Sequence, residues 1–393
     1  MNTGKCIQLE KKVILNTYSR PDFVLTHGKG VYVYDKENKK YLDFCAGIAV
    51  NALGHCEKTS VKILKKQAEK LWHCSNLYYS EPQIRVAELL TRITFADKVF
   101  FCNSGAEAIE GALKIARKWA HAVKDKNAHQ IISFHQAFHG RTFGALSATG
   151  QPKFWEGFEP LVPGFVYATF NDLESVKKHI TPHTCAIIAE PVQGESGIFP
   201  AQKAFLQGLR NLCDENNCLL IFDEIQCGLG RTGSFCAYEH SGIEPDIMTM
   251  AKPIAGGLPM GTILMKDHIA EHTKVGNHGS TFGGGPLVSR VAEHVIKTIA
   301  DGDFLTHVKK TGQYLKDQLS QIKSDKITAI RGKGLIVGVE LDQDPQKIIQ
   351  TCVSNGLLLC KAGNNTIRFL PPLTVKKKHI DKAMGIFQRS LKG

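Results

Sequence analysis

The sequence lacks the long apolar segments that a membrane or secreted protein would carry. Its longest apolar runs, such as residues 185–189 and 219–222, are far shorter than the ~20 residues that a membrane span requires. The N-terminal stretch contains no apolar segment of the kind found in secretory signals. Long repeats and low-complexity tracts are also missing. We therefore expect a globular, cytoplasmic protein with no membrane partner.

The sequence also lacks a C-x-x-C pair, although it contains 12 cysteines. Cys102, Cys185 and Cys360 stand inside apolar runs, where a free cysteine acts as a small hydrophobic residue. Without a secretory signal, a reducing cytosol is favoured over an oxidising compartment. The cysteines therefore predict free thiols rather than a disulfide framework.

Acidic residues are fewer than basic ones. Against 49 Lys and Arg stand 37 Asp and Glu, which gives a net charge of +12. The basic residues are scattered, with short clusters at residues 65–66 and 376–378 and no interleaved aromatic residues. This scatter disfavours nucleic-acid binding. A solvated basic surface and a site that attracts carboxylate substrates both fit the charge.

The apolar segments that are present predict alternating strands and helices. A short buried strand over residues 99–105 runs into a helix expected at 106–123. Apolar strands separated by helices favour an α/β core with helices on both faces of the sheet. Further strands are expected at residues 130–134, 185–192, 219–225, 247–252 and 262–266, with a helix at 203–216.

The length of 393 residues fits two or three domains. Alternating residues over 30–44, with a turn at Glu37-Asn38, predict a β-hairpin. Beyond Pro286 a long helical stretch leads into an α+β region. We predict an N-terminal segment with the hairpin at 1–45, a large domain at 46–287 and a small domain at 288–393.

The stretch LLIFDEIQCGLGRTG, residues 219–233, contains the spacing G-x-G-x-x-G of dinucleotide-binding proteins. A true fingerprint needs the glycines directly after a strand and a helix that opens at the third glycine. Here polar residues intervene, and Gly242 and Pro245 would break a following helix. The glycines therefore predict an irregular loop near a site, with a dinucleotide-dependent oxidoreductase as a remote alternative.

The segment CNSGAEA, residues 102–108, predicts a phosphate site. A strand leads through Ser104 and Gly105 into a helix, and the free N–H groups at a helix start bind phosphate. Glycine lets the backbone approach such a ligand closely. A serine N-cap without a ligand is the alternative interpretation.

Asp223 and Lys252 each stand at the end of an apolar strand, where ligands of open α/β sheets gather. A buried carboxylate at position 223 needs a cationic partner, which a protonated pyridine nitrogen or an internal salt bridge would supply. Lys252 precedes the Pro- and Gly-rich loop 253–261. A partly desolvated lysine there has a lowered pKa and can form a Schiff base; a solvent-exposed lysine is the alternative.

The segment FHQAFHGRT, residues 134–142, adds an aromatic residue and a cation. Phe138 can stack on a ring, and Arg141 can bind a carboxylate in bidentate fashion. His135 and His139 have a spacing that metal ligands use, but a third ligand is not evident, so no metal site is predicted. A phosphate site, a ring-facing aromatic residue, a buried acid and a strand-end lysine together describe a pyridoxal phosphate pocket.

Nine stretches of the sequence resemble the successive signature blocks of class III, fold type I, aminotransferases. The resemblance covers nearly the whole chain and implies pyridoxal 5′-phosphate as cofactor. It also implies a mostly parallel seven-stranded sheet between helices, a smaller α+β C-terminal domain, and a homodimer with shared active sites. The stretches are YLDFCAGIAVNALGH, SNLYYSEPQ, NSGAEA, FHGRT, EPVQGESG, FDEIQCGLGRTG, AKPIAGGLPMG, HGSTFGGGPL and IRFLPPL.

The resemblance assigns cofactor-binding roles to residues that match the family motifs. Lys252 would hold the cofactor covalently and shuttle a proton, and Asp223 would pair with the ring nitrogen. Phe138 would stack on the ring and Gln226 would hydrogen-bond its phenolic oxygen. The phosphate would be bound by Ser104, Gly105 and Ala106, and by Thr281 from the neighbouring subunit.

The resemblance also assigns substrate-binding roles. Arg141 would bind one substrate carboxylate and Arg368 the other carboxylate of glutamate or 2-oxoglutarate, with Ser280 beside the substrate. Glu195 would pair with Arg368 and mask it while the amine donor is bound. The family usually has Asn at position 109 and in place of Gly285, and KPLGGG where KPIAGG stands. These departures affect loop geometry and substrate preference more than the reaction class.

The reaction implied is transfer of the terminal amino group of N-acetylornithine to 2-oxoglutarate. The products would be N-acetylglutamate semialdehyde and glutamate, as in arginine biosynthesis. Ornithine, succinylornithine, succinyl-diaminopimelate and 4-aminobutyrate remain alternative amino donors, because the pocket for the acyl group decides among them. An aminomutase and a non-catalytic binding protein are further alternatives, and the two arginines and the lysine argue against them.

Overall fold

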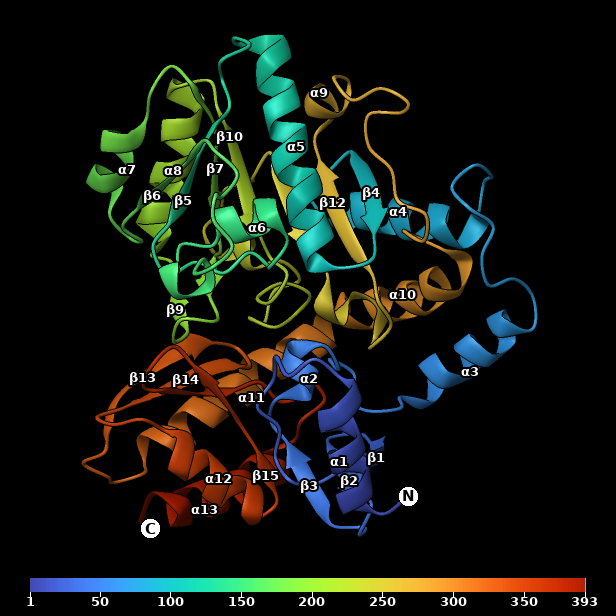
Figure 1. Cartoon of the computed structure of the whole chain (residues 1–393), viewed down its shortest axis with the longest axis vertical. Helices are drawn as coiled ribbons and strands as arrows, with labels where there is room; N and C mark the ends of the chain where they lie inside the picture. The colour runs from blue at the N-terminus through green and yellow to red at the C-terminus, as the bar shows by residue number, and fades with distance from the viewer. Residues whose placement is uncertain (393) are drawn as a thin grey trace.

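The computed structural model describes residues 1–392 (Figure 1). Its N-terminal part contains the predicted hairpin, in which β2 (Tyr32–Asp35) and β3 (Lys40–Asp43) pair in antiparallel fashion. Helix α1 (Thr3–Val13) precedes it, and β1 (Leu25–Lys29) extends it on the side of β2. On the other side β15 (Leu357–Leu358) pairs with β3, so the hairpin packs against the C-terminal part of the chain.

A seven-stranded sheet forms the centre of the molecule. Five neighbouring strands run parallel, and β12 is antiparallel to both of its neighbours, which confirms the predicted mostly parallel sheet. The strands in spatial order are β4 (Lys98–Cys102), β12 (Gly261–Met265), β11 (Ile247–Met250), β10 (Leu219–Asp223), β7 (Thr184–Ala189), β5 (Gln130–Phe134) and β6 (Phe165–Ala168).

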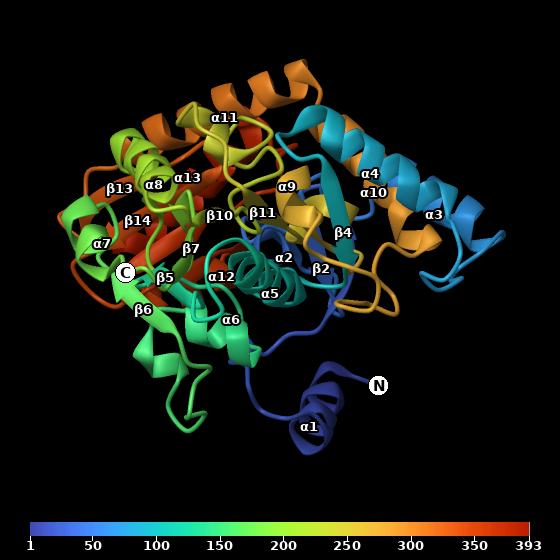
Figure 2. The ribbon, with the colours of Figure 1, turned by 90° about the horizontal axis from the view of Figure 1, so that it is seen from above.

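Helices cover both faces of this sheet because its strands are apolar on both sides. Along a strand, neighbouring side chains point to opposite faces. Leu220 accordingly packs in the core on one face with α8, whereas Ile221 packs on the other face with α5. Figure 2 shows the sheet between these two layers. The helices around the sheet are α3 (Lys58–Ala68), α4 (Glu81–Ile93), α5 (Gly105–Val123), α6 (Phe143–Ala148), α7 (Leu173–His179), α8 (Lys203–Glu215), α9 (Asp267–Ala270) and α10 (Pro286–Ile299).

The C-terminal part is an α+β unit that lies beside the N-terminal hairpin in the lower half of Figure 1. Its four-stranded sheet is antiparallel throughout. We keep 1–45, 46–287 and 288–393 as a proposal for the domain division. The strands in spatial order are β13 (Ile327–Lys333), β14 (Ile336–Leu341), β17 (Thr366–Phe369) and β16 (Cys360–Ala362), with helices α11 (Gly302–Ser320), α12 (Gln346–Ser354) and α13 (Lys377–Lys392).

Several short elements lie between the longer strands and helices along the chain. Helix α2 (Ala46–Ala49) follows β3, and the two-stranded ribbon of β8 (Val192–Gln193) and β9 (Phe199–Pro200) follows β7. Three 3₁₀ helices complete the set: η1 (Pro152–Phe154), η2 (Ala237–His240) and η3 (Lys252–Ala255). No helix within residues 1–392 combines the length and the apolar character needed to cross a membrane.

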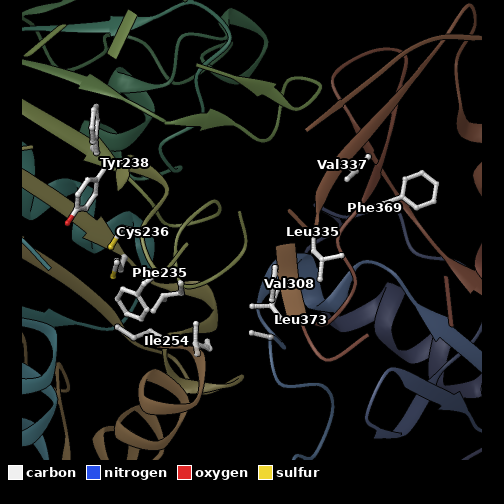
Figure 3. Close-up of a cluster of buried hydrophobic side chains, with 14 of the residues drawn as sticks. Phe235, Cys236, Tyr238, Ile254, Val308, Leu335, Val337, Phe369 and Leu373 are labelled. Carbon is white, nitrogen blue, oxygen red and sulfur yellow. The ribbon is translucent and has the colours of Figure 1, made fainter. Parts of the chain in front are cut away.

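The glycine-rich loop after β10 joins the two halves of the molecule. No α-helix opens at Gly233, and the first helical turn after it is η2, so the loop is irregular as predicted. Arg231 in this loop is buried, and its Nη1 donates to the carbonyls of Leu335 (3.0 Å) and Pro371 (2.6 Å). Apolar side chains from both halves, including Phe235 and Val308, belong to one continuous buried cluster (Figure 3).

Candidate active site

A cavity of about 400 Å³ opens where the parallel strands of the large sheet end. It is the place at which such sheets bind ligands. Seven of the predicted site residues line it: Ser104, Gly105, Ala106, Phe138, Asp223, Gln226 and Lys252. The other lining residues include Val50, Asn103, His139, Glu190, Ile225 and the loop residues 257–260.

The N-terminus of α5 forms one wall of the cavity. Ser104 has an extended backbone and caps the helix, because its hydroxyl accepts from the N–H of Glu107 (3.2 Å). The N–H groups of Gly105 and Ala106, ahead of Glu107 in the first turn, have no acceptor within the helix and are therefore available to a ligand. A Cβ at Gly105 would lie 2.9 Å from Cδ1 of Ile225, so glycine allows the helix start to pack this closely. The N-cap interpretation and the anion-site interpretation are compatible here.

Asp223 ends β10 and is buried in the cavity wall. Its Oδ2 lies 2.7 Å from Nδ1 of His139, and its Oδ1 accepts from the N–H of Ile225 (3.0 Å). Burial lowers the pKa of His139, but the hydrogen bond to Asp223 and its charge outweigh burial and raise it. Nε2 of His139 is buried without a hydrogen-bond partner among residues 1–392. The internal salt bridge considered for Asp223 therefore exists alongside its place in the cavity.

Lys252 follows β11 and faces the same cavity. Its φ is +36°, in the left-handed region that non-glycine residues rarely occupy, and such strain concentrates at functional sites. Burial lowers the pKa of the Lys252 ammonium, and the nearby positive charge of Arg368 acts in the same direction. Asp223, Glu190 and Glu195 oppose this shift without cancelling it. The surroundings of Lys252 thus favour its neutral amine over the ammonium form more than water does.

Arg368 and Glu195 form an ion pair next to the cavity. Nη1 of Arg368 donates to Oε2 of Glu195 (2.9 Å), to the carbonyl of Gly194 (3.0 Å) and to Oε1 of Gln226 (3.0 Å). Burial lowers the pKa of Arg368, but Cys360 and Glu195 outweigh it and raise the pKa. The side chain of Arg368 is 1% exposed and that of Glu195 is 32% exposed, so the carboxylate is the partner that can move away.

Five predicted site residues lie outside the cavity lining: Glu195 and Arg368, described above, and Arg141, Ser280 and Thr281. Arg141 is exposed, with its guanidinium carbon 6.0 Å from the ring centre of Phe138. Ser280 contacts the lining residue Asn103, whose Nδ2 donates to its Oγ (3.2 Å). Thr281 lines a separate small hollow on the surface. Within one chain, therefore, these residues stand at the edge of the site or apart from it.

The sequence analysis missed two ionisable side chains of the cavity, His139 and Glu190, and left one acid unexplained. His139 had been considered only as a metal ligand with His135, which is exposed and outside the lining. Glu190 also lines the cavity, and its position directly after β7 was a usable signal because Asp223 follows the same rule. Glu224 points away and accepts from the N–H groups of Ala237 (2.6 Å) and Tyr238 (2.7 Å). Burial raises the pKa of Glu224 to about 8.

Comparison with known proteins places this site in a family. The family model described as aminotransferase class-III matches residues 14–391. The chain belongs to the class III aminotransferases. This aminotransferase is 47% identical over 387 residues to the acetylornithine aminotransferase of Clostridium acetobutylicum, covering 98% of this chain and all of that protein. It is 48% identical to that of Methanocaldococcus jannaschii, over 97% of this chain and 96% of that one.

Solved structures agree with the fold of this aminotransferase. The ornithine aminotransferase of Toxoplasma gondii superposes with a TM-score of 0.96 at 30% identity, covering 100% of this chain and 95% of that one. The mostly parallel seven-stranded sheet and the C-terminal α+β unit are therefore arranged as in an enzyme of the same reaction class.

Proposed function

We propose that this aminotransferase uses pyridoxal 5′-phosphate to transfer the terminal amino group of N-acetylornithine to 2-oxoglutarate. The products are N-acetylglutamate semialdehyde and glutamate, and the reaction serves arginine biosynthesis. One observation carries the chemistry: Lys252, Asp223 and the N-terminus of α5 face a single cavity. The names of the relatives at 47% and 48% identity support N-acetylornithine as the amino donor.

The donor set of the cavity fits pyridoxal 5′-phosphate. The first-turn N–H groups at Gly105 and Ala106, with the Ser104 cap, suit a phosphate. Asp223 suits a protonated ring nitrogen, and Phe138 suits the face of a ring. The side-chain oxygen of Gln226 accepts a hydrogen bond from Arg368, which leaves the amide N–H₂ of Gln226 to donate to a phenolic oxygen. When bound, this cofactor supplies a carbonyl that takes up the amino group and a ring that withdraws electrons.

Lys252 is the residue that moves protons in the proposed reaction. Its amine would hold the cofactor between turnovers and, once released, would take a proton from the substrate carbon and return one to its product position. A lowered pKa suits both tasks because a neutral amine is a nucleophile and a base. The hydrogen bond between His139 and Asp223 fixes the direction of the Asp223 carboxylate.

The two arginines account for substrates that differ in charge. Arg141, at the exposed edge, would bind the carboxylate that all substrates share. Arg368 is already paired with Glu195, so it would accept a second carboxylate only when Glu195 moves away. N-acetylornithine would leave the pair closed, whereas glutamate and 2-oxoglutarate would open it. This exchange explains how one site serves both half-reactions.

We further infer a homodimer in the cytoplasm that acts on small molecules. Thr281 lies outside the cavity lining of its own chain, and in the proposed dimer it would reach toward the phosphate of a neighbouring subunit. Ser280, held by Asn103, would stand beside the substrate. Neither nucleic acid nor a membrane is part of this proposal.

A panel of amino donors tests the proposed function. We expect protein purified with pyridoxal 5′-phosphate to be yellow, and to lose this absorbance faster with N-acetylornithine than with ornithine, succinylornithine or 4-aminobutyrate. The preference should be about tenfold or more, the range over which binding-pocket contacts discriminate similar substrates. A faster reaction with another donor would replace N-acetylornithine in the proposal. A colourless protein that takes up no cofactor would refute the chemistry itself.

Removing Glu195 tests the proposed exchange at Arg368. In Glu195→Ala the guanidinium stays open to a second carboxylate. The rate of the glutamate half-reaction, divided by that of the N-acetylornithine half-reaction, should therefore rise about tenfold, the effect expected for loss of one charged hydrogen bond. The two rates are measured by the absorbance change in single turnovers. Asp214→Ala, which removes a carboxylate from the Arg210 pair (2.7 Å) on α8, is the control and should leave the ratio unchanged. An unchanged ratio in Glu195→Ala would exclude the exchange.

A further inference from the structure

Glu190 is a carboxylate in the cavity wall for which the proposed reaction has no use. It directly follows β7, it is 5% exposed, and it lines the cavity with Lys252 and Asp223. Burial raises its pKa to about 7; the charge of Asp223 adds to this and that of His139 opposes it. A buried acid of this kind is costly unless its oxygens are hydrogen-bonded.

The two oxygens of Glu190 bind the backbones of two different loops. Oε1 accepts from the N–H of Phe138 (2.9 Å), in the loop after β5. Oε2 accepts from the N–H of Gly194 (3.2 Å), at the end of β8. Gly194 in turn accepts from Nη1 of Arg368 through its carbonyl (3.0 Å). A continuous chain of hydrogen bonds therefore runs from the residue that faces the cofactor ring to Arg368.

Gly194 is held from three sides. Glu190 binds its N–H, Arg368 binds its carbonyl, and a Cβ at this position would lie 2.3 Å from Oε1 of Gln226. The backbone at Gly194 therefore packs directly against Gln226. Glu195 is the next residue, so its movable side chain is attached to a backbone that is fixed.

We propose that Glu190 is a positioning residue that anchors the backbone beneath the Glu195–Arg368 pair and thereby sets the affinity for dicarboxylate substrates. The proposal rests on the proposed function, in which Glu195 moves away when a second carboxylate arrives. Arg368 then keeps its bonds to the Gly194 carbonyl and to Gln226, and both must stay in place to hold the guanidinium. Without Glu190, the N–H of Gly194 loses its acceptor and this backbone is released.

Loss of Glu190 should weaken substrate binding in the half-reaction that uses glutamate or 2-oxoglutarate. N-acetylornithine leaves the Glu195–Arg368 pair closed, so the ion pair itself still holds the segment when Glu190 is lost. Glutamate and 2-oxoglutarate open the pair, and the segment then depends on the contacts of Gly194 itself, among them the bond from its N–H to Glu190. If Glu190 only supported the fold, its loss would weaken the binding of both substrates equally.

Two variants separate the reach of Glu190 from its charge. Glu190→Gln keeps the shape but presents an N–H₂ group to one of the two backbone donors. Glu190→Asp keeps the charge but is one methylene too short. For both variants we expect the KM for 2-oxoglutarate to rise about tenfold and the KM for N-acetylornithine to stay within about twofold. A tenfold rise is the loss of affinity expected when one hydrogen bond to a charged group is removed.

A binding measurement gives the same test without turnover. Glutarate has two carboxylates and no reactive carbonyl, and calorimetry on the cofactor-loaded protein should show its Kd about tenfold higher in Glu190→Gln. Glu224→Gln is the matched control, because Glu224 is also buried and also accepts from two backbone N–H groups but lies outside the cavity lining. It should reduce thermal stability and leave the glutarate Kd and the ratio of the two KM values unchanged.

The outcomes distinguish the inference from the function on which it rests. Wild-type protein without transamination would refute the proposed function. Active wild-type protein with equal KM changes for both substrates in Glu190→Gln would overturn the positioning role. Wild-type KM values in Glu190→Asp would also overturn it, because charge alone would then be sufficient.

Discussion

Replacing Lys252 with alanine should lower the rate of amino transfer by about 10⁴-fold or more, because one side chain supplies both the nucleophile and the proton carrier. Asp223 and the helix start would still bind the cofactor, so binding weakens but is not lost. The fold should remain intact, since Lys252 is absent from the ion pairs found among residues 1–392. Single-turnover absorbance with N-acetylornithine measures the rate.

Covalent attachment gives a second measurement on the same variant. Borohydride should fix one cofactor to each wild-type chain, and intact mass and peptide mapping should place it on Lys252. Lys266→Ala is the control, because Lys266 also follows a strand of the sheet but its amine pairs with Glu244 (2.9 Å) at the surface. That control should be labelled and active like the wild type. Labelling of Lys252→Ala, or a rate within tenfold of the wild type, would contradict the assignment.

The large sheet could be predicted because its strands carry their own signal. Apolar runs at 130–134 and 219–223 are too short for helices and are buried on both sides, as parallel strands are. The carboxyl ends of parallel strands meet at one edge of a sheet, which brings Asp223 and the start of α5 to that edge. The site was therefore predictable to the extent that its residues stand at strand ends.

Pairing between distant side chains could not be predicted in this way. Nothing in the sequence relates His139 to Asp223, or Glu190 to the backbone of Gly194, because these contacts depend on how the loops cross above the sheet. The adjacent acids Asp223 and Glu224 show the same limit. One turns into the cavity and the other binds the start of η2, and only the path of the glycine-rich loop decides which.

Asp223→Asn should reduce the rate of amino transfer by about 10²- to 10³-fold, the loss typical of removing one electrostatic group from an enclosed site. The amide keeps the size of the side chain but has no charge to hold a ring nitrogen protonated. It also leaves His139, buried and with a pKa raised by Asp223, without its anionic partner. The rate constant of the N-acetylornithine half-reaction, compared with the Kd of the cofactor, separates chemistry from binding.

Glu224→Gln isolates the effect of position from that of burial. Glu224 is adjacent and fully buried, and the amide of Glu224→Gln would present an N–H₂ group to one of the N–H groups of Ala237 and Tyr238, which should cost about 1–3 kcal/mol of unfolding free energy. The rate should stay near that of the wild type because this side chain points away from the cavity. Similar rate losses in both variants would mean that the two acids act on the fold, and the assignment of Asp223 to the ring nitrogen would fail. A loss confined to Asp223→Asn would tie catalysis to Asp223, which lines the cavity with Lys252, and not to its buried neighbour in the sequence.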